Sequence, residues 1–464
     1  MDISERLDEA EDLFCDEKYE ESDREFERLL KLASDEEEAC QIVERWVSCL
    51  MERYYELQDI QEYDEALVLC EKAIKTLRLY QHRFVEKILM ARNDRAGFLK
   101  EIERYDEAEA EYKDLVLKCR LRYGIKAHDT YIAMGNLAGV YCDTGRSLAA
   151  ISLRSRAVNG FLELYGEENS DYIRELINLA HDYENIGNYA KAIPMLEKAY
   201  KLRQRKRGKS NDLTINVLFQ FAVCFKRIQQ SYEAVRLYKI AVSRIKSDDF
   251  YTLIHKVQYA ICLAWIGKEK QARLLADQLS GQIGSSEFGV DVLRENMEYL
   301  YSSIALYKRD YNKALMCAKK AAACIEDAPD GERRFSAEKY IAEMSFYAGE
   351  YQSAYTILER ISDFYETTEY NVVDLLMYYY IRANVTASLG LFAEAEKCVF
   401  RTMTVSRQCT FAAAPFLAYS AKAFLALKRG EPENFERLRS IALGYARAGM
   451  DMREFEVVWL RDLQ

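Results

Sequence analysis

The chain has 464 residues, of which only 4 are prolines and 19 are glycines, and its formal net charge is −11. A single globular core rarely exceeds about 300 residues, so this length predicts several domains or an open array of repeats. Hairpins and long loops need proline and glycine, so their scarcity argues against a sheet-rich protein and favours helices joined by short turns. The acidic balance disfavours nucleic acid as a partner, because phosphate binding depends on clustered lysine and arginine.

The N-terminal residues show no secretory signal pattern, and no apolar run approaches the roughly 20 residues that a membrane-spanning helix needs. No membrane partner is therefore expected. The twelve cysteines are scattered without Cys-x-x-Cys spacing, which predicts reduced thiols that pack as small apolar side chains. Such thiols indicate a cytoplasmic location.

From the N-terminus onward, small side chains recur in a fixed register. One small residue returns about every 42 positions, and another small residue stands twelve positions before it in most copies. The first series is Ser22, Ala66, Ala108, Ala150, Ala192, Ala234, Ala272, Ala314, Ala354, Ala395 and, as a degenerate member, Phe435. Antiparallel helices approach closely only where side chains are small, so each copy predicts one helix pair.

A glycine five residues before the small residue, as at Gly187, Gly349 and Gly390, predicts the turn inside a pair. Glycine ends a helix in the left-handed conformation at little cost. Each pair leaves an apolar face that the next pair covers, so the stack propagates. The predicted fold is an all-α solenoid, a superhelix of about eleven antiparallel helix pairs.

The regularity of the register divides the chain into divergent repeats (residues 1–94), regular repeats (95–280), a second irregular set (281–448) and a final segment (449–464). Residues 281–290, rich in glycine and serine, break the 42-residue phase and predict a hinge or a change of curvature. The final segment predicts a capping helix, which a solenoid needs. Its apolar residues recur at helical spacing: Met452, Phe455, Val458, Trp459 and Leu463.

The repeated pattern resembles the tetratricopeptide repeat, for example in Ala180, Tyr183, Gly187, Tyr189 and Ala192. The period of about 42 residues resembles the longer repeats of kinesin light chains. Three linkers follow one another at that spacing: Tyr123-Gly124, Tyr165-Gly166 and Arg207-Gly208. The resemblance covers roughly residues 5–446 and is strongest over 96–272. It implies that the first helix of each pair lines a concave, ligand-binding face.

In repeats of this type, the residue two positions before the small residue of the first helix points into that face. This offset selects a row of four amides: Asn136, Asn178, Gln220 and Gln258. Neighbouring offsets add Arg174, Asn216, Asp143, Asn185, Arg227 and Trp265. Amides donate and accept hydrogen bonds, which suits the backbone of an extended peptide, and the two arginines suit an acidic group. An alternative interpretation is that the amides only bond a neighbouring helix.

The sequence contains no recognisable catalytic constellation, metal-binding motif or phosphate-binding loop, so no cofactor and no metal is expected. His181 and Asp182 are adjacent, and adjacent helical side chains point about 100° apart, so they are not expected to form a pair. The basic run at 201–209 fits a solvated helix end, or else a site for an acidic partner. Tyr378, Tyr379 and Tyr380 cannot all face one way, so at least one is expected at the surface.

These features predict a non-enzymatic scaffold or adaptor that binds a protein or an extended peptide in its concave groove; assembly into a homo-oligomer is compatible with them. One alternative is a bacterial peptide-sensing regulator of the pheromone-receptor type that lacks its own DNA-binding domain, because residues 1–50 resemble a repeat instead of a helix-turn-helix. A third alternative is an enzyme carried on a helical scaffold.

Overall fold

The computed structural model describes residues 3–246, 249–283, 289–325, 331–367, 372–409, 411 and 413–463. Over these residues the regular secondary structure is helical throughout, as predicted. The chain divides into two compact units, Met1–Glu175 and Leu176–Gln464. None of the described helices is both long enough and apolar enough to cross a lipid bilayer.

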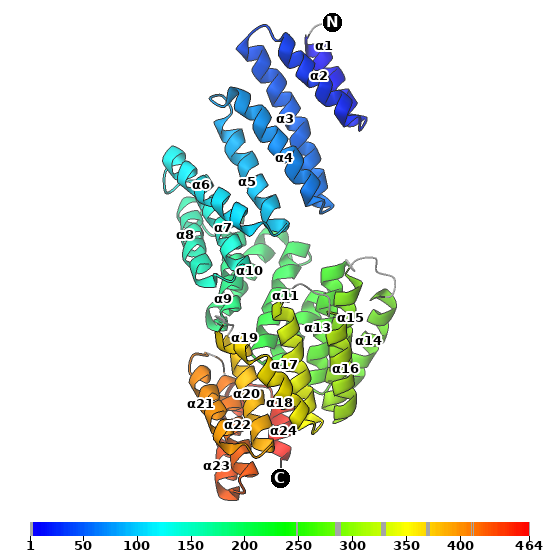
Figure 1. Cartoon of the computed structure of the whole chain (residues 1–464), viewed down its shortest axis with the longest axis vertical. Helices are drawn as coiled ribbons and strands as arrows, with labels where there is room; N and C mark the ends of the chain where they lie inside the picture. The colour runs from blue at the N-terminus through cyan, green and yellow to red at the C-terminus, as the bar shows by residue number, and fades with distance from the viewer. Residues whose placement is uncertain are drawn as a thin grey trace. The chain divides into compact units, whose positions relative to one another are not determined.

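The first unit holds four helix pairs (Figure 1). Its helices are α1 (Ile3–Cys15), α2 (Tyr19–Leu32), α3 (Glu36–Asp59), α4 (Tyr63–Leu77), α5 (Val85–Glu101), α6 (Tyr105–Tyr123), α7 (His128–Asp143) and α8 (Ser147–Tyr165), with a 3-10 turn, η1 (Arg78–Tyr80), after α4. Each helix packs against the next along the chain from α1 to α8. That sequential packing is the defining property of a solenoid. The boundary between the units falls within α9 (Ser170–Asn185).

The second unit is also built of helix pairs, and its last described helix is short and single. Its helices are α10 (Tyr189–Arg207), α11 (Asp212–Arg227), α12 (Ser231–Val242), α13 (Phe250–Trp265), α14 (Glu269–Ile283), α15 (Val290–Tyr307), α16 (Tyr311–Ala323), α17 (Gly331–Tyr347), α18 (Tyr351–Arg360), α19 (Ser362–Thr367), α20 (Val372–Ser388), α21 (Phe392–Ser406), α22 (Ala413–Lys428), α23 (Pro432–Gly449) and α24 (Phe455–Asp462). The helix α9 pairs in sequence with α10, and α24 remains without a pair partner in the repeat pattern.

The small residues of the register lie where the paired helices cross. All nine alanines of the series from Ala66 to Ala395 are fully buried, with 0% exposure. Serine takes this place twice, and each hydroxyl donates to a backbone carbonyl twelve residues away: Ser22 to Ala10 at 2.7 Å and Ser302 to Ala314 at 2.8 Å. A hydroxyl is tolerated at a dry crossing because it has this acceptor.

The turn inside each pair has one common feature, a left-handed residue five positions before the small residue. Glycine occupies six of these positions: Gly145, Gly187, Gly267, Gly349, Gly390 and Gly430. Other residues occupy five: Glu17, Gln61, Glu103, Gln229 and Arg309. All have φ between 57° and 82°. This recurrence, seen in the described part of the chain, confirms the eleven predicted helix pairs.

The three predicted linkers also adopt left-handed backbone conformations. Gly124, Gly166 and Gly208 have φ of 96°, 76° and 87° and directly follow α6, α8 and α10. The N–H of each bonds the carbonyl four residues earlier at 3.0 Å. These glycines therefore end the second helix of a pair, as the strict spacing indicated.

The prediction that one of Tyr378, Tyr379 and Tyr380 is exposed is wrong. Their exposures are 0%, 8% and 1%. Their helix, α20, is covered by neighbours on several sides, including α17, α18, α21 and α22. Tyr378 stacks on Tyr365 of α19 with ring centres 4.7 Å apart. A helix enclosed in this way buries successive side chains whatever direction they take.

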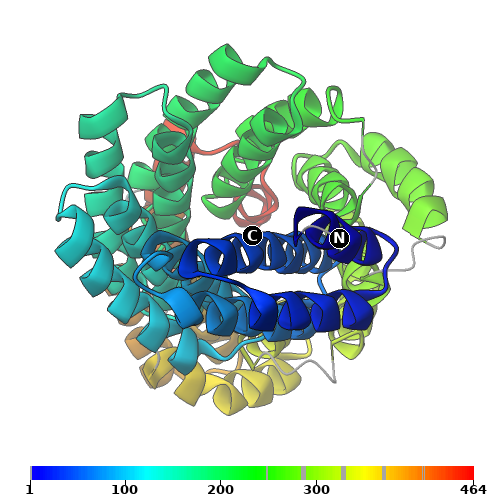
Figure 2. The same ribbon diagram turned by 90° about the horizontal axis from the view of Figure 1, so that it is seen from above.

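Two regions of the second unit depart from the regular helix pairs. In the predicted hinge at residues 281–290, residues 284–288 lie outside the described part of the chain, while Gly289 (φ 64°) precedes α15. The last helix, α24, packs against α23, and its aromatic rings also contact α17 and α22. Viewed from above, α24 (red) lies on the inner side of the second unit's green helices (Figure 2).

Candidate peptide-binding surface

All ten side chains of the candidate site lie on first helices and are at least partly exposed. They are carried by α7 (Asn136, Asp143), α9 (Arg174, Asn178, Asn185), α11 (Asn216, Gln220, Arg227) and α13 (Gln258, Trp265). The crossing residues of the same helices, such as Ala138 and Ala222, are fully buried. A residue two positions before the crossing points about 200° around the helix, away from the partner helix.

Each unit holds its own part of this set. In the first unit, Asn136 on α7 donates its amide N–H to the side-chain oxygen of Asn93 on α5 at 2.7 Å. Lys100 on α5 donates to Asp143 on α7 at 3.3 Å. Polar side chains of consecutive first helices are therefore linked along this surface.

A cavity of about 500 Å³ opens beside the Asn93–Asn136 pair. It is lined by α5, α6 and α7, through Glu86, Lys87, Leu89, Met90, Asn93, Leu115, Cys119, Tyr123, Asp129, Ile132 and Ala133. Apolar walls with a few charged and amide groups are typical of ligand-binding pockets. Asn93 thus both bonds Asn136 of the amide row and lines the cavity.

Arg174 on α9 is surrounded by acidic side chains in the first unit. Its guanidinium is 2.9 Å from Asp171 and 3.2 Å from Glu175. Glu175 is buried and pairs at 2.9 Å with Arg154, which is also buried. An acidic ligand would have to compete with these carboxylates for Arg174.

In the second unit, Gln258 on α13 is the centre of a short hydrogen-bond chain. It donates to Asn296 on α15 at 2.6 Å and accepts a hydrogen bond from Lys226 on α11. Asn296 in turn donates to the carbonyl of Val292 at 2.8 Å. Three consecutive first helices are joined by this chain.

Lys226 and Trp265 form a second feature of this surface. The Lys226 ammonium lies 5.5 Å from the centre of the Trp265 ring, and the indole N–H donates to Ser303 at 3.1 Å. Burial lowers the pKa of Lys226 to about 8, and the nearby charge of Arg227 acts in the same direction. Lys226 is therefore a cation that an anionic ligand would stabilise.

Two of the amides form the bonds to a neighbouring helix that the alternative interpretation expects. Asn136 and Gln258 do bond neighbouring first helices. Each bond uses only part of the hydrogen-bonding capacity of an amide, which has two N–H donors and an oxygen. Asn178 and Gln220 are partly exposed, and Asn216 and Arg227 are exposed.

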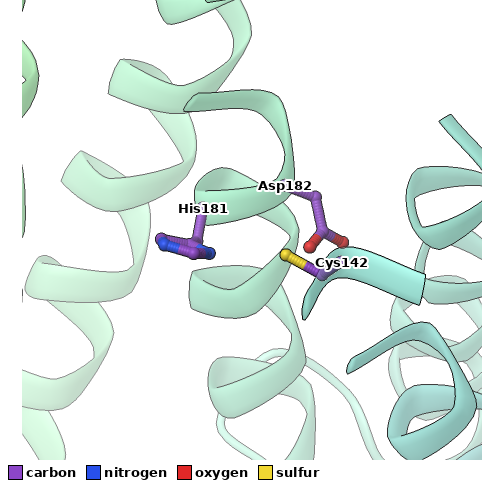
Figure 3. Close-up of side chains that lie close together, drawn as sticks. All are labelled: Cys142, His181 and Asp182. Carbon is purple, nitrogen blue, oxygen red and sulfur yellow. The ribbon is translucent and has the colours of Figure 1, made fainter. Parts of the chain in front are cut away.

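His181 and Asp182 leave α9 in different directions (Figure 3). His181 is exposed, whereas Asp182 is fully buried. Their ligating atoms nevertheless lie within 4.8 Å of each other, so the two side chains are neighbours although they leave the helix in different directions. Cys142, the third side chain labelled in Figure 3, belongs to α7 in the first unit.

The basic run at 201–209 ends α10, whose last turn contains Arg205, Lys206 and Arg207. Lys201 pairs with Glu197 at 2.6 Å, and Arg203 donates to the carbonyl of Leu213 at 2.7 Å. Cations at a helix C-terminus favour the helix dipole. The position of the run agrees with a solvated helix end.

Sequence reasoning missed three polar residues of this surface: Asn93, Lys226 and Asn296. Asn93 stands three residues before its crossing residue, Ala96, instead of two. Asn296 stands six residues before Ser302, and Lys226 stands four after Ala222. A search for amides about one repeat from Asn136 and Gln258, free of a fixed offset, would have found Asn93 and Asn296.

A family model described as "Tetratricopeptide repeat" matches residues 129–205 and 171–247. Among curated proteins, a Candida albicans clustered mitochondria protein homolog is 25% identical over 153 residues, which is 32% of this chain. The match covers only 11% of the length of that relative.

Two solved structures resemble this chain over most of its length. The apo form of the quorum sensor NprR from B. thuringiensis gives a TM-score of 0.53 at 14% identity and covers 78% of this chain and 98% of NprR. The apo form of RapI gives the same TM-score at 12% identity, with 78% of this chain and 98% of RapI covered. At such identities the likeness establishes the fold alone.

Proposed function

We propose that this chain, whose residues 129–205 and 171–247 match the tetratricopeptide repeat, is a non-enzymatic scaffold or adaptor that binds a partner protein or an extended peptide along its first helices. The observation that carries the proposal is the row of partly exposed amide and charged side chains on α7, α9, α11 and α13. These helices are buried where they cross their partner helices, so this row faces the available surface.

The chemistry of the row suits a peptide backbone. An extended peptide presents N–H and C=O groups that are not bonded within the ligand. Asn136 uses one amide N–H for Asn93, and Gln258 uses one for Asn296. The second N–H of each amide can donate to a peptide carbonyl. The bonds to Asn93 and Asn296 already order these side chains. Less conformational entropy is therefore lost when a ligand binds.

The two units favour different side chains of a ligand. In the first unit, the cavity next to Asn93 offers apolar walls formed by Leu89, Met90 and Ile132. In the second unit, Lys226 and the exposed Arg227 offer positive charge. A ligand of the first unit should therefore carry an apolar anchor, and a ligand of the second unit an acidic group.

The test is affinity capture from a source lysate with the intact chain, read by mass spectrometry. The variant Asn136→Ala, Asn178→Ala, Gln220→Ala removes three amides of the row. The matched control is Lys113→Ala, Glu163→Ala, Lys201→Ala, which removes three exposed side chains from second helices. Partner enrichment should fall at least tenfold in the amide variant and remain at the wild-type level in the control. Enrichment that is equal in all three chains would contradict the proposal.

A peptide-sensing regulator is the second candidate, and the similarity to the quorum sensor NprR favours it. In that case the ligand is a short peptide instead of a protein. Native mass spectrometry of the intact chain, incubated with the peptide fraction of the same lysate, separates the two candidates. A bound mass below about ten residues would support the regulator, whereas a captured protein would support the scaffold.

Three further properties belong to the same proposal. We place the protein in the cytoplasm, where its mostly buried cysteines remain reduced. Its acidic net charge disfavours nucleic acid as a ligand. Assembly into a homo-oligomer is compatible with the proposal, and light scattering of the purified chain measures it directly.

A further inference from the structure

The last described residues of the chain lie against α12, α17 and α22 of the second unit. This C-terminal segment (residues 450–463) consists of a non-helical connector followed by α24. It follows α23, yet its contacts reach as far back as α12. Figures 1 and 2 both show α24 beside helices from distant parts of the unit.

Aromatic rings hold the helical part of the segment. Phe455 meets Tyr347 edge to face, with ring centres 5.0 Å apart. Trp459 packs against Phe346 and Tyr347 of α17, both at 5.8 Å, and against Phe424 of α22 at 5.4 Å. One face of α24 is thus inserted between two first helices. This is the mode by which amphipathic helices bind grooves.

Polar groups hold the two ends of the segment. At its start, the Glu454 carboxylate accepts a hydrogen bond from the backbone N–H of Ser231 at 2.8 Å. Ser231 is the first residue of α12, where backbone N–H groups lack partners within the helix and the helix dipole favours a carboxylate. At its end, Asp462 forms an ion pair with Arg309.

A further cation fixes the connector. The Arg453 guanidinium lies over the Tyr232 ring of α12 at 5.1 Å and pairs with Asp451 at 2.7 Å. Together, these contacts reach α12, α17 and α22 of the second unit. The contacted groups therefore suit a helix that carries a carboxyl group followed by aromatic residues.

The surface that contacts the C-terminal segment, here called its seat, also contains acidic groups. These groups weaken the binding of the segment. Burial raises the pKa of Glu454 and Glu456, and it raises the pKa of Glu343 on α17 to about 8. Glu343 and Glu456 also repel each other when both are ionised. Desolvation of carboxylates opposes the gain from aromatic packing, so the segment is held less tightly than its apolar contacts alone would allow.

We propose that the C-terminal segment is a built-in, displaceable ligand of the second unit, and that a partner helix of the same chemistry competes for its seat. Such a partner carries an acidic residue at the position of Glu454 and aromatic residues one and five positions later. This inference rests on the proposed function, since it names the ligand class of a further surface of the same binding protein. Release of the segment is then the step that opens the surface.

The first experiment measures release in the intact wild-type chain by hydrogen exchange and mass spectrometry. The amides of residues 455–462 should exchange as one group and at least tenfold faster than those of α17 and α22. Exchange as slow as in α17 and α22 would overturn the proposal, because the segment would then be a fixed part of the core.

The second experiment uses a fluorescent peptide of residues 450–464 and fluorescence anisotropy. Phe455→Ala, Trp459→Ala in the full chain weakens the resident segment, and the matched control is Tyr251→Ala, Phe400→Ala, whose rings are 68% and 70% exposed. The weakened chain should bind the peptide at least tenfold more tightly than the wild type or the control. Equal binding by all three chains, or no binding to the weakened chain, would overturn the proposal.

The two proposals can fail separately. A lysate partner captured equally by the wild type and the weakened chain would overturn the displaceable-ligand proposal and leave the scaffold function standing. A weakened chain that binds the peptide but captures no partner would support the displaceable ligand and count against the scaffold function.

Discussion

The carboxylate of Glu454 accepts a hydrogen bond of 2.8 Å from the backbone N–H of Ser231, 223 residues earlier in the chain. Both residues are buried, with exposures of 1% and 0%. Ser231 begins α12, so the carboxyl group occupies the positive end of a helix dipole. The contact joins the end of the chain to the middle of the second unit.

Two replacements of Glu454 separate the two effects of its side chain on stability. The hydrogen bond to Ser231 stabilises the fold, and the buried charge destabilises it. Glu454→Gln keeps an oxygen acceptor for the Ser231 N–H and removes the ionisable group, whose pKa is raised by burial. We expect a higher midpoint of thermal unfolding than the wild type at pH 8 and a similar midpoint at pH 5. Glu454→Leu leaves a buried N–H without its acceptor and should cost about 1–3 kcal/mol at either pH. A Glu454→Gln chain less stable than the wild type at pH 8 would show that the charge itself stabilises the contact.

Stability should fall as the pH rises from about 5 to about 8. Glu343 has a pKa of about 8 in the folded chain, because it is buried and close to Glu456, with Lys339 acting in the opposite direction. A carboxyl group whose folded pKa is raised binds its proton more tightly in the folded state. Its contribution is complete below the unfolded pKa near 4.3 and is lost as the pH rises through the folded value. Urea unfolding at a series of pH values measures this loss.

The variant Glu343→Gln tests the assignment of that pH dependence. It should flatten the curve between pH 5 and pH 8 and raise the stability at pH 8 by up to a few kcal/mol, since one pKa unit corresponds to about 1.4 kcal/mol. The exposed Glu163→Gln is the control and should leave the curve unchanged. A slope that persists in Glu343→Gln would assign it to Glu454 and Glu456, whose pKa values are also raised.

Glycine should stabilise those turns that lack it. Glu103 occupies the left-handed position between α5 and α6 with φ 62°. A non-glycine residue there costs about 1–2 kcal/mol, partly offset by the greater freedom of glycine in the unfolded chain. We expect Glu103→Gly to stabilise the protein by roughly 0.5–1 kcal/mol in urea unfolding. Ala110→Gly, at an exposed position within α6, is the control and should cost about 1 kcal/mol.

Two helical glycines of the first unit should respond to alanine in opposite ways. A Cβ at Gly160 of α8 would lie 2.1 Å from the ring of Tyr131 on α7, whereas one at Gly139 of α7 would meet nothing within 4 Å. Gly160→Ala should therefore destabilise the unit by about 1–3 kcal/mol through overpacking. Gly139→Ala should stabilise it by up to about 1 kcal/mol through helix propensity. Thermal unfolding followed by circular dichroism compares the two, and stabilisation by both would show that Tyr131 moves aside freely.

The exposure of the ten selected side chains could be predicted from the sequence, because each was chosen by its distance from a crossing residue. An offset of two from Ala138 or Ala222 places a side chain on the side of the helix that is turned away from the crossing, and both Asn136 and Gln220 are indeed partly exposed. The hydrogen-bond partners did not follow from that offset. Asn93 and Asn296 occupy other positions of their repeats, and their contacts depend on how one pair is rotated against the next.

The sequence by itself determined the helix pairs, their crossings and their turns. Those features are local: twelve residues separate the two crossing positions, and five residues separate each left-handed turn residue from its small residue. Short-range packing and backbone conformation are sufficient to specify them.

Only the tertiary structure decided which distant surfaces meet in the second unit. The seat of the C-terminal segment against Ser231, Tyr347 and Phe424, and the burial of Tyr378–Tyr380, depend on the curvature of the stacked pairs. That curvature is the sum of many small rotations between neighbouring repeats. A contact across more than two hundred residues therefore reflects the accumulated geometry of the stack, which no single copy of the repeat pattern contains.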